Sequence, residues 1–116
     1  MKYVLTSVLL LTVGAAASSV AVSAQKPQTY TGIITDNVCA TEGHTAMRMG
    51  PTDAECTRIC VMSHGTGAFV LLDGKTVYNL SDQNSPEKLA AEKVRVVGRL
   101  DTKTNTIQVQ SISAVK

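Results

Sequence analysis

The segment Lys93-Val-Arg-Val-Val-Gly-Arg-Leu-Asp101 decides the fold, because apolar and charged residues alternate along it. The alternation of Val94, Arg95 and Val96 is the pattern of a strand with one buried face. The same alternation returns at Ile107-Gln-Val-Gln110, after a polar stretch over 101–105 that is typical of a turn. The sequence therefore predicts a hairpin of two half-buried strands near its end.

Three further strands and one short helix are predicted before this hairpin. Asp73-Gly74 is a strong hairpin-turn signal and separates two apolar runs. The Ser-Pro-Glu sequence at 85–87 is typical of the first turn of a helix. Gly32 lies inside the first apolar run, where we expect a bulge or a close approach of another strand. The predicted elements are strands over 30–36, 68–72 and 76–80 and a brief helix over 85–92.

The order of these elements predicts a mainly β fold, a small five-stranded barrel of the OB type. Five strands with a helix between the third and the fourth are the layout of such a barrel. The segment between the first two strands is then a loop-helix insert, and it holds all three cysteines and both histidines.

Two parts of the sequence carry a resemblance to known proteins. The closing hairpin and the opening Tyr30-Thr-Gly-Ile-Ile-Thr-Asp36 resemble exported bacterial OB-fold proteins. The whole chain, with its D-x-x-C…H-x-x-M…C-x-x-x-C-V run, is also similar to small exported bacterial domains of unassigned function. The resemblance implies the fold and export, and it implies no activity.

The insert holds Cys39, His44, Cys56 and Cys60 in the spacing C-x4-H-x11-C-x3-C. The part over 37–50 has no hydrophobic period, so we expect a loop there. A helix is predicted over 51–64, because the residues at 52 and 55 have capping-box spacing. Cys56 and Cys60 then lie one helical turn apart, on the same face.

Metal binding is the most specific hypothesis for this insert. Thiolate and imidazole are the usual ligands of zinc and also suit copper. We expect Cys39, His44, Cys56 and Cys60 to be the ligands, with His64 and Met47 as second choices. The sequence leaves the choice between zinc and copper open.

Two other interpretations of the cysteines remain open from the sequence. A disulfide from Cys39 to Cys56 or Cys60 would staple the insert and leave a third thiol unpaired. Alternatively, one cysteine with a nearby histidine as base would make a thiol redox protein. C-x-x-C redox and haem-attachment motifs do not occur, so the sequence favours a protein that is not an enzyme.

Residues 1–24 have the layout of a secretory signal peptide. Lys2 gives a positive start, an apolar run follows, and Val22-Ser23-Ala24 offers a cleavage site of small residues. We expect cleavage after Ala24, a single domain over 25–116, and a periplasmic or secreted location; an uncleaved anchor is the alternative. The apolar run is shorter than a membrane span requires.

Charge and aromatic content limit the partners. The whole chain carries a formal charge of +2, and aromatic residues make up 3% of it. Binding of single-stranded nucleic acid requires a positive groove and stacking aromatic side chains, so we do not expect a nucleic-acid partner. The expected function is that of an envelope binding or accessory protein, whose partner is another envelope protein or a small ligand.

Overall fold

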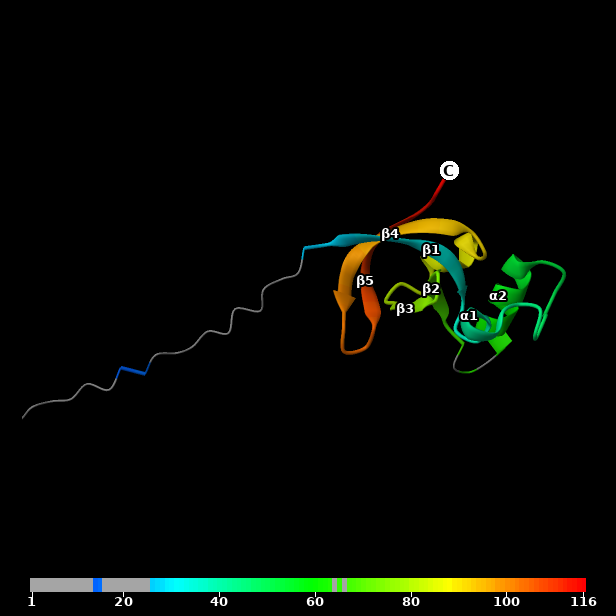
Figure 1. The fold of residues 1–116 in the computed structure, drawn as a ribbon, viewed down its shortest axis with the longest axis horizontal. Coiled ribbons are helices and arrows are strands. Elements are labelled where there is room, and N and C mark those ends of the chain that lie inside the picture. The colour runs from blue at the N-terminus through cyan, green and yellow to red at the C-terminus, as the bar shows by residue number, and fades with distance from the viewer. Residues whose placement is uncertain (1–13, 16–25, 64, 66) are drawn as a thin grey trace, which may run out of the picture.

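The structure is a computed structural model that describes residues 14–15, 26–63, 65 and 67–116 (Figure 1). His64 and nearly all of the predicted signal peptide lie outside the described residues. The elements run in the order β1 (Gln28–Asp36), α1 (Cys39–Glu42), α2 (Asp53–Ser63), β2 (Phe69–Asp73), β3 (Thr76–Leu80), η1 (Ser85–Leu89), β4 (Lys93–Asp101) and β5 (Thr106–Ala114).

The five strands close into a ring in the order β1-β2-β3-β5-β4, with β4 pairing back to β1. All neighbouring pairs are antiparallel except β3 and β5, which run parallel over a short stretch. The mainly β class and the predicted order of the five strands are therefore confirmed. Among the described residues, no helix is long and apolar enough to cross a membrane.

The interior of the ring is filled by the apolar residues that the alternating pattern placed on one face. In β4, Val94 and Val96 are buried while Arg95 and Arg99 are exposed, as the sequence predicts. Burying such side chains stabilises the fold by about 1.5–3 kcal/mol each. The buried core consists of Ile34, Phe69, Leu71, Leu80, Val94, Val96 and Ile107.

Gly32 marks the corner at which β1 changes partners. Residues up to Ile33 pair with β4, and residues from Ile33 onward pair with β2. A Cβ atom at Gly32 would lie 2.5 Å from the backbone oxygen of Leu72, so only glycine fits there. The predicted close approach at this glycine is confirmed. It allows β1 to bend and to deliver Asp36 to the base of the insert.

Two local predictions need correction. The segment over 37–50 is not entirely a loop, because α1 forms one helical turn immediately after β1. The predicted brief helix over 85–92 is instead a 3-10 turn that ends at Leu89. It stops there because Ala91 adopts a φ of 65° and donates its N–H to the Ile34 carbonyl at 2.8 Å, which returns the chain to the sheet.

The two helices of the insert lie beyond one end of the ring (Figure 1). Val61 of α2 packs against the core of the ring, and the Arg58 Nε donates to the backbone oxygen of Glu87 at 2.9 Å. The predicted helix is confirmed over Asp53–Ser63, and the Thr52 hydroxyl accepts the backbone N–H of Glu55 at 3.2 Å. The N-cap half of the predicted capping box, the hydrogen bond to the Thr52 hydroxyl, is thus present.

Candidate metal centre

Three cysteine thiols converge between α1 and α2. Cys39 opens α1, whereas Cys56 and Cys60 lie one turn apart on α2. Their sulfur atoms all lie within 4.8 Å of one another. The exposed fractions are 4% for Cys39, 0% for Cys56 and 1% for Cys60, so the cluster is closed to bulk solvent. This arrangement brings three soft ligand atoms to one place.

Asp36 fixes the position of Cys39. The Asp36 Oδ1 accepts the backbone N–H groups of Val38 and Cys39 at 3.0 and 2.9 Å. These two bonds give a carboxylate acceptor to donors at the start of α1, where helix N–H groups have no partner within the helix. Hydrogen bonds therefore join the end of β1 directly to the cysteine that opens α1.

Cys56 is held by the loop that leads into α2. The backbone N–H of Met49 donates to the Cys56 sulfur at 3.3 Å, and the Cys56 thiol lies 3.6 Å from the Met47 carbonyl oxygen. The Met49 side chain packs against the three cysteines, while that of Met47 is 50% exposed. Met49 is thus the methionine whose side chain contacts the cluster. Met47, the second-choice ligand, contacts Cys56 through its backbone carbonyl instead.

The cluster environment favours protonated thiols when no ion is bound. Burial raises the pKa of Cys39, and the adjoining Asp36 carboxylate raises it further. Burial also raises the pKa of Cys60, with added contributions from Asp36 and Cys56. A metal ion reverses this preference, because it binds thiolates and displaces their protons.

His44 belongs to a second group of ligand atoms, together with Asp36 and Cys39. One atom from each of these residues lies within 4.8 Å of the other two. The His44 Nε2 lies 3.5 Å from the Thr35 hydroxyl, and its Nδ1 is buried without a hydrogen-bond partner. The Oδ2 of Asp36 is likewise buried and unpartnered. Each side chain therefore has one atom facing a protein partner and one that is available to a ligand.

The four ligands expected from the sequence are divided between the two groups. Cys39, Cys56 and Cys60 form the first, while His44 meets only Cys39 among them. The second-choice ligand His64 lies outside the described residues. All three cysteines of the chain are described, and none forms a disulfide, so the bridge from Cys39 to Cys56 or Cys60 is not made in this structure.

Asp36 is the residue of the site that the sequence interpretation missed. It was not among the candidate ligands, and in the structure its carboxylate caps α1. Its spacing to Cys39, D-x-x-C, was the available signal. The sequence does not reveal that Asp36 is buried. The residue is 0% exposed, and a buried carboxylate requires a compensating partner.

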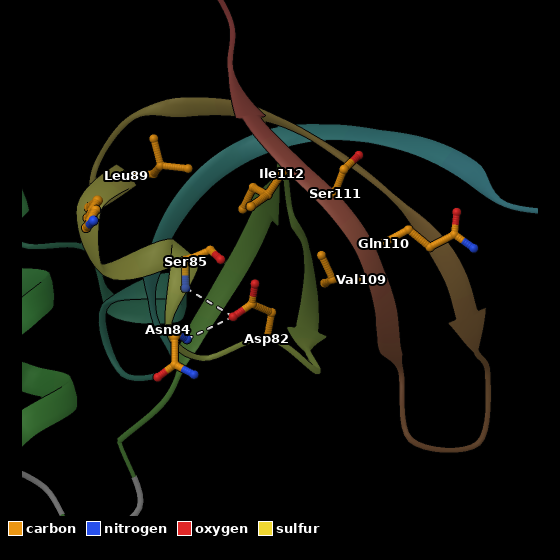
Figure 2. Close-up of a pocket in the computed structure, with 9 residues that line it drawn as sticks. Asp82, Asn84, Ser85, Leu89, Val109, Gln110, Ser111 and Ile112 are labelled. Atoms are coloured by element: carbon orange, nitrogen blue, oxygen red, sulfur yellow. Dashed lines mark hydrogen bonds between the residues drawn. The ribbon is translucent and has the colours of Figure 1, made fainter.

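An open groove of about 610 Å³ lies elsewhere, between η1 and β5 (Figure 2). The Asp82 Oδ1 accepts the backbone N–H groups of Asn84 and Ser85 at 2.9 and 3.0 Å. This carboxylate is thus already engaged in holding the start of η1. None of the cysteines lines the groove, so it is separate from the cluster.

No known protein family, curated protein or solved structure matches the chain.

Proposed function

We propose that this chain is an exported bacterial envelope protein that binds a transition-metal ion through Cys39, Cys56 and Cys60. The observation that carries the proposal is the convergence of three buried, unbridged sulfur atoms within 4.8 Å. Thiolates at such a spacing suit zinc or copper(I), which both favour sulfur ligands. The role is that of a binding or accessory protein, with no reaction assigned.

The sulfur environment supports metal binding over the thiol redox alternative. Reactive cysteines are partly exposed and have a lowered pKa. Here the thiols are buried, and the pKa values of Cys39 and Cys60 are raised. A buried group of this kind favours an ion that neutralises the thiolates once they form.

The fold and location are part of the same proposal. The ring of five strands, with the insert between β1 and β2, supports an OB-type barrel as the scaffold. The layout of residues 1–24 supports export to the periplasm or the medium. In that setting a bound ion would protect the three thiols from oxidation, because oxidation proceeds through free thiolates.

A disulfide-stabilised interaction module is the competing proposal, and one experiment separates the two. The protein is exported to a bacterial periplasm, purified without chelator, and assayed for metal by mass spectrometry. Thiols are counted after denaturation in the presence of chelator. We expect bound zinc or copper and three free thiols; one free thiol without metal would overturn the metal proposal.

A pair of variants in α2 provides the control. Cys56→Ser removes a sulfur ligand and should lower the amount of metal retained through purification, because the ion loses one of its three thiolates. Met62→Ser also replaces an apolar sulfur side chain of α2, but this residue is 77% exposed and outside the cluster. It should retain as much metal as the unaltered protein.

A further inference from the structure

The metal centre proposed above leaves two buried ligand atoms without a function. The Oδ2 of Asp36 and the Nδ1 of His44 have no hydrogen-bond partner. Leaving such an atom unpaired in the interior is unfavourable, and more so for a charged group. Two unpaired atoms on neighbouring ligand-type residues indicate that something binds there.

The two groups of ligand atoms meet at one residue. The Cys39 sulfur lies within 4.8 Å of the sulfur atoms of Cys56 and Cys60, and also within 4.8 Å of a ligand atom of Asp36 and one of His44. No other residue belongs to both groups. A thiolate sulfur has enough lone pairs to bind two ions at once, and paired metal ions in proteins lie about 3.5–4 Å apart. Cys39 is therefore placed to bridge two ions.

The buried charge also favours two ions. With every ligand deprotonated, three thiolates and the Asp36 carboxylate place four negative charges in a space closed to solvent. One divalent ion balances half of this charge, and a second balances the remainder. Metal ions supply this balance when they displace the thiol protons.

We propose that the insert binds a pair of divalent ions bridged by the Cys39 thiolate. Cys56 and Cys60 complete the ligands of the first ion, and Asp36 and His44 complete those of the second. The inference rests on the proposed function, since both ions use Cys39. The second ion has three protein ligands of three kinds, so one tetrahedral position stays open to water or to an external ligand.

Neighbouring groups already orient the second set of ligands. Backbone N–H groups engage the Asp36 Oδ1 and leave its Oδ2 available. The Thr35 hydroxyl faces the His44 Nε2 and leaves Nδ1 available. Such contacts from the surrounding protein commonly fix the orientation of metal ligands. The site is thus arranged for a ligand on those two free atoms.

Metal titration of the full chain tests the number of ions. The reduced, metal-free protein is titrated with Zn²⁺ by calorimetry and loaded with Cd²⁺ for cadmium NMR. We expect about two equivalents of zinc per chain and two cadmium resonances. One resonance should have the shift of an all-sulfur site, and the other that of a mixed sulfur, nitrogen and oxygen site.

Variants on each side of Cys39 assign the two ions. His44→Ala and Asp36→Asn should each remove the mixed-ligand resonance and leave about one equivalent of zinc. Asparagine keeps an oxygen that can accept the N–H bonds of α1. Cys60→Ala should weaken the all-sulfur site instead. The carboxylate of Asp82 lies outside both groups, so Asp82→Asn is the matched control. This variant should still bind two ions.

The outcomes distinguish this inference from the proposed function. One equivalent of zinc in an all-sulfur environment would overturn the two-ion centre and leave the single-ion proposal intact. No bound ion would overturn both. Two ions whose resonances are unchanged in a folded His44→Ala variant would also overturn the inference. If circular dichroism shows that a variant is unfolded, the zinc stoichiometry and the number of cadmium resonances of the unaltered chain still test the inference.

Discussion

The ring of strands and the insert over 39–63 are stabilised by different chemistry. The ring buries aliphatic and aromatic side chains, among them Ile34, Leu71 and Val96. The buried residues of the insert are Cys39, Cys56 and Cys60, with Met49 packed against them. An aliphatic core is stabilised because its side chains are removed from water. A cluster of thiols, in contrast, gains most of its stabilisation when a metal ion binds. The comparison predicts that metal affects the insert and leaves the ring largely unchanged.

The largest effect is expected in the ring. Leu71 is completely buried in its core, so Leu71→Ala should lower the free energy of unfolding by about 2–5 kcal/mol. The loss should be of similar size with and without zinc, because the cavity lies in the aliphatic core and is not formed by the ligands. Urea unfolding followed by circular dichroism measures it. A loss that appears only with metal bound would break the distinction between the two regions.

Cys60→Ala is the matching change in the insert. The alanine keeps a small apolar side chain, so we expect only a small loss of stability in the metal-free protein. With zinc at 100 times the Kd of the all-sulfur site, however, the unaltered chain should gain about 2.7 kcal/mol from that site, and the variant should gain less. Thermal unfolding with and without zinc measures the difference. An equal gain in both proteins would show that Cys60 is not a ligand.

Removing the ion should open the insert selectively. Arg48 lies in the exposed part of the insert, where its side chain forms an exposed ion pair with Asp53 at 2.7 Å. We expect trypsin to cleave after Arg48 about tenfold faster once a chelator removes the metal, as a loss of about 1.4 kcal/mol in local stability implies. Acidification should act in the same direction, because protons displace the ion from thiolates.

The turn between β4 and β5 provides the internal control for this digestion. Lys103 is exposed there, and its backbone N–H donates to the Asp101 carboxylate at 3.0 Å. Cleavage after Lys103 should be equally fast with and without chelator. Equal acceleration at Arg48 and Lys103 would mean that metal stabilises the whole chain, and the comparison of ring and insert would fail.

The smallest expected effect is on how the stability of the ring depends on pH. Hydrogen bonds from the Ser85 side chain and from the backbone of Ser85 and Asn84 lower the pKa of the Asp82 carboxyl. Because the folded pKa lies below the unfolded value of about 3.9, this carboxylate stabilises the fold above that pH. The stabilisation is lost as the pH falls through the folded pKa.

Asp82→Ala should therefore lower the stability of the ring by about 1 kcal/mol at neutral pH. The difference from the unaltered chain should disappear in strong acid, where the carboxyl is protonated in both states. Urea unfolding at several pH values measures this trend. A difference that stays constant across the acid range would assign the effect to lost packing.

The parts of the fold that follow from local patterns were predictable from the sequence. Alternation identified the buried valines of β4, Asp73-Gly74 identified the hairpin turn, and Thr52 identified the start of α2. Gly74 has a φ of 60°, which suits the mirror-image turns of short hairpins. In each case a few neighbouring residues determine the outcome.

The site depends on contacts between distant segments, and local patterns do not encode those. The spacing of Cys56 and Cys60 on one helix face predicted that they meet. The path of the loop over 43–52 decides that His44 turns toward Asp36 and Cys39, and that path has no periodic signal. The short helix α1 escaped prediction for a related reason, since a single turn capped by Asp36 is too brief to show a hydrophobic period.

X-ray absorption at the zinc edge of the zinc-loaded protein tests the central claim most directly. If the three thiols of the insert bind the ion, the spectrum will contain sulfur neighbours at about 2.3 Å from zinc. The same measurement on Cys56→Ser should show fewer sulfur neighbours. A first shell composed only of nitrogen and oxygen at about 2.0–2.2 Å would contradict the account.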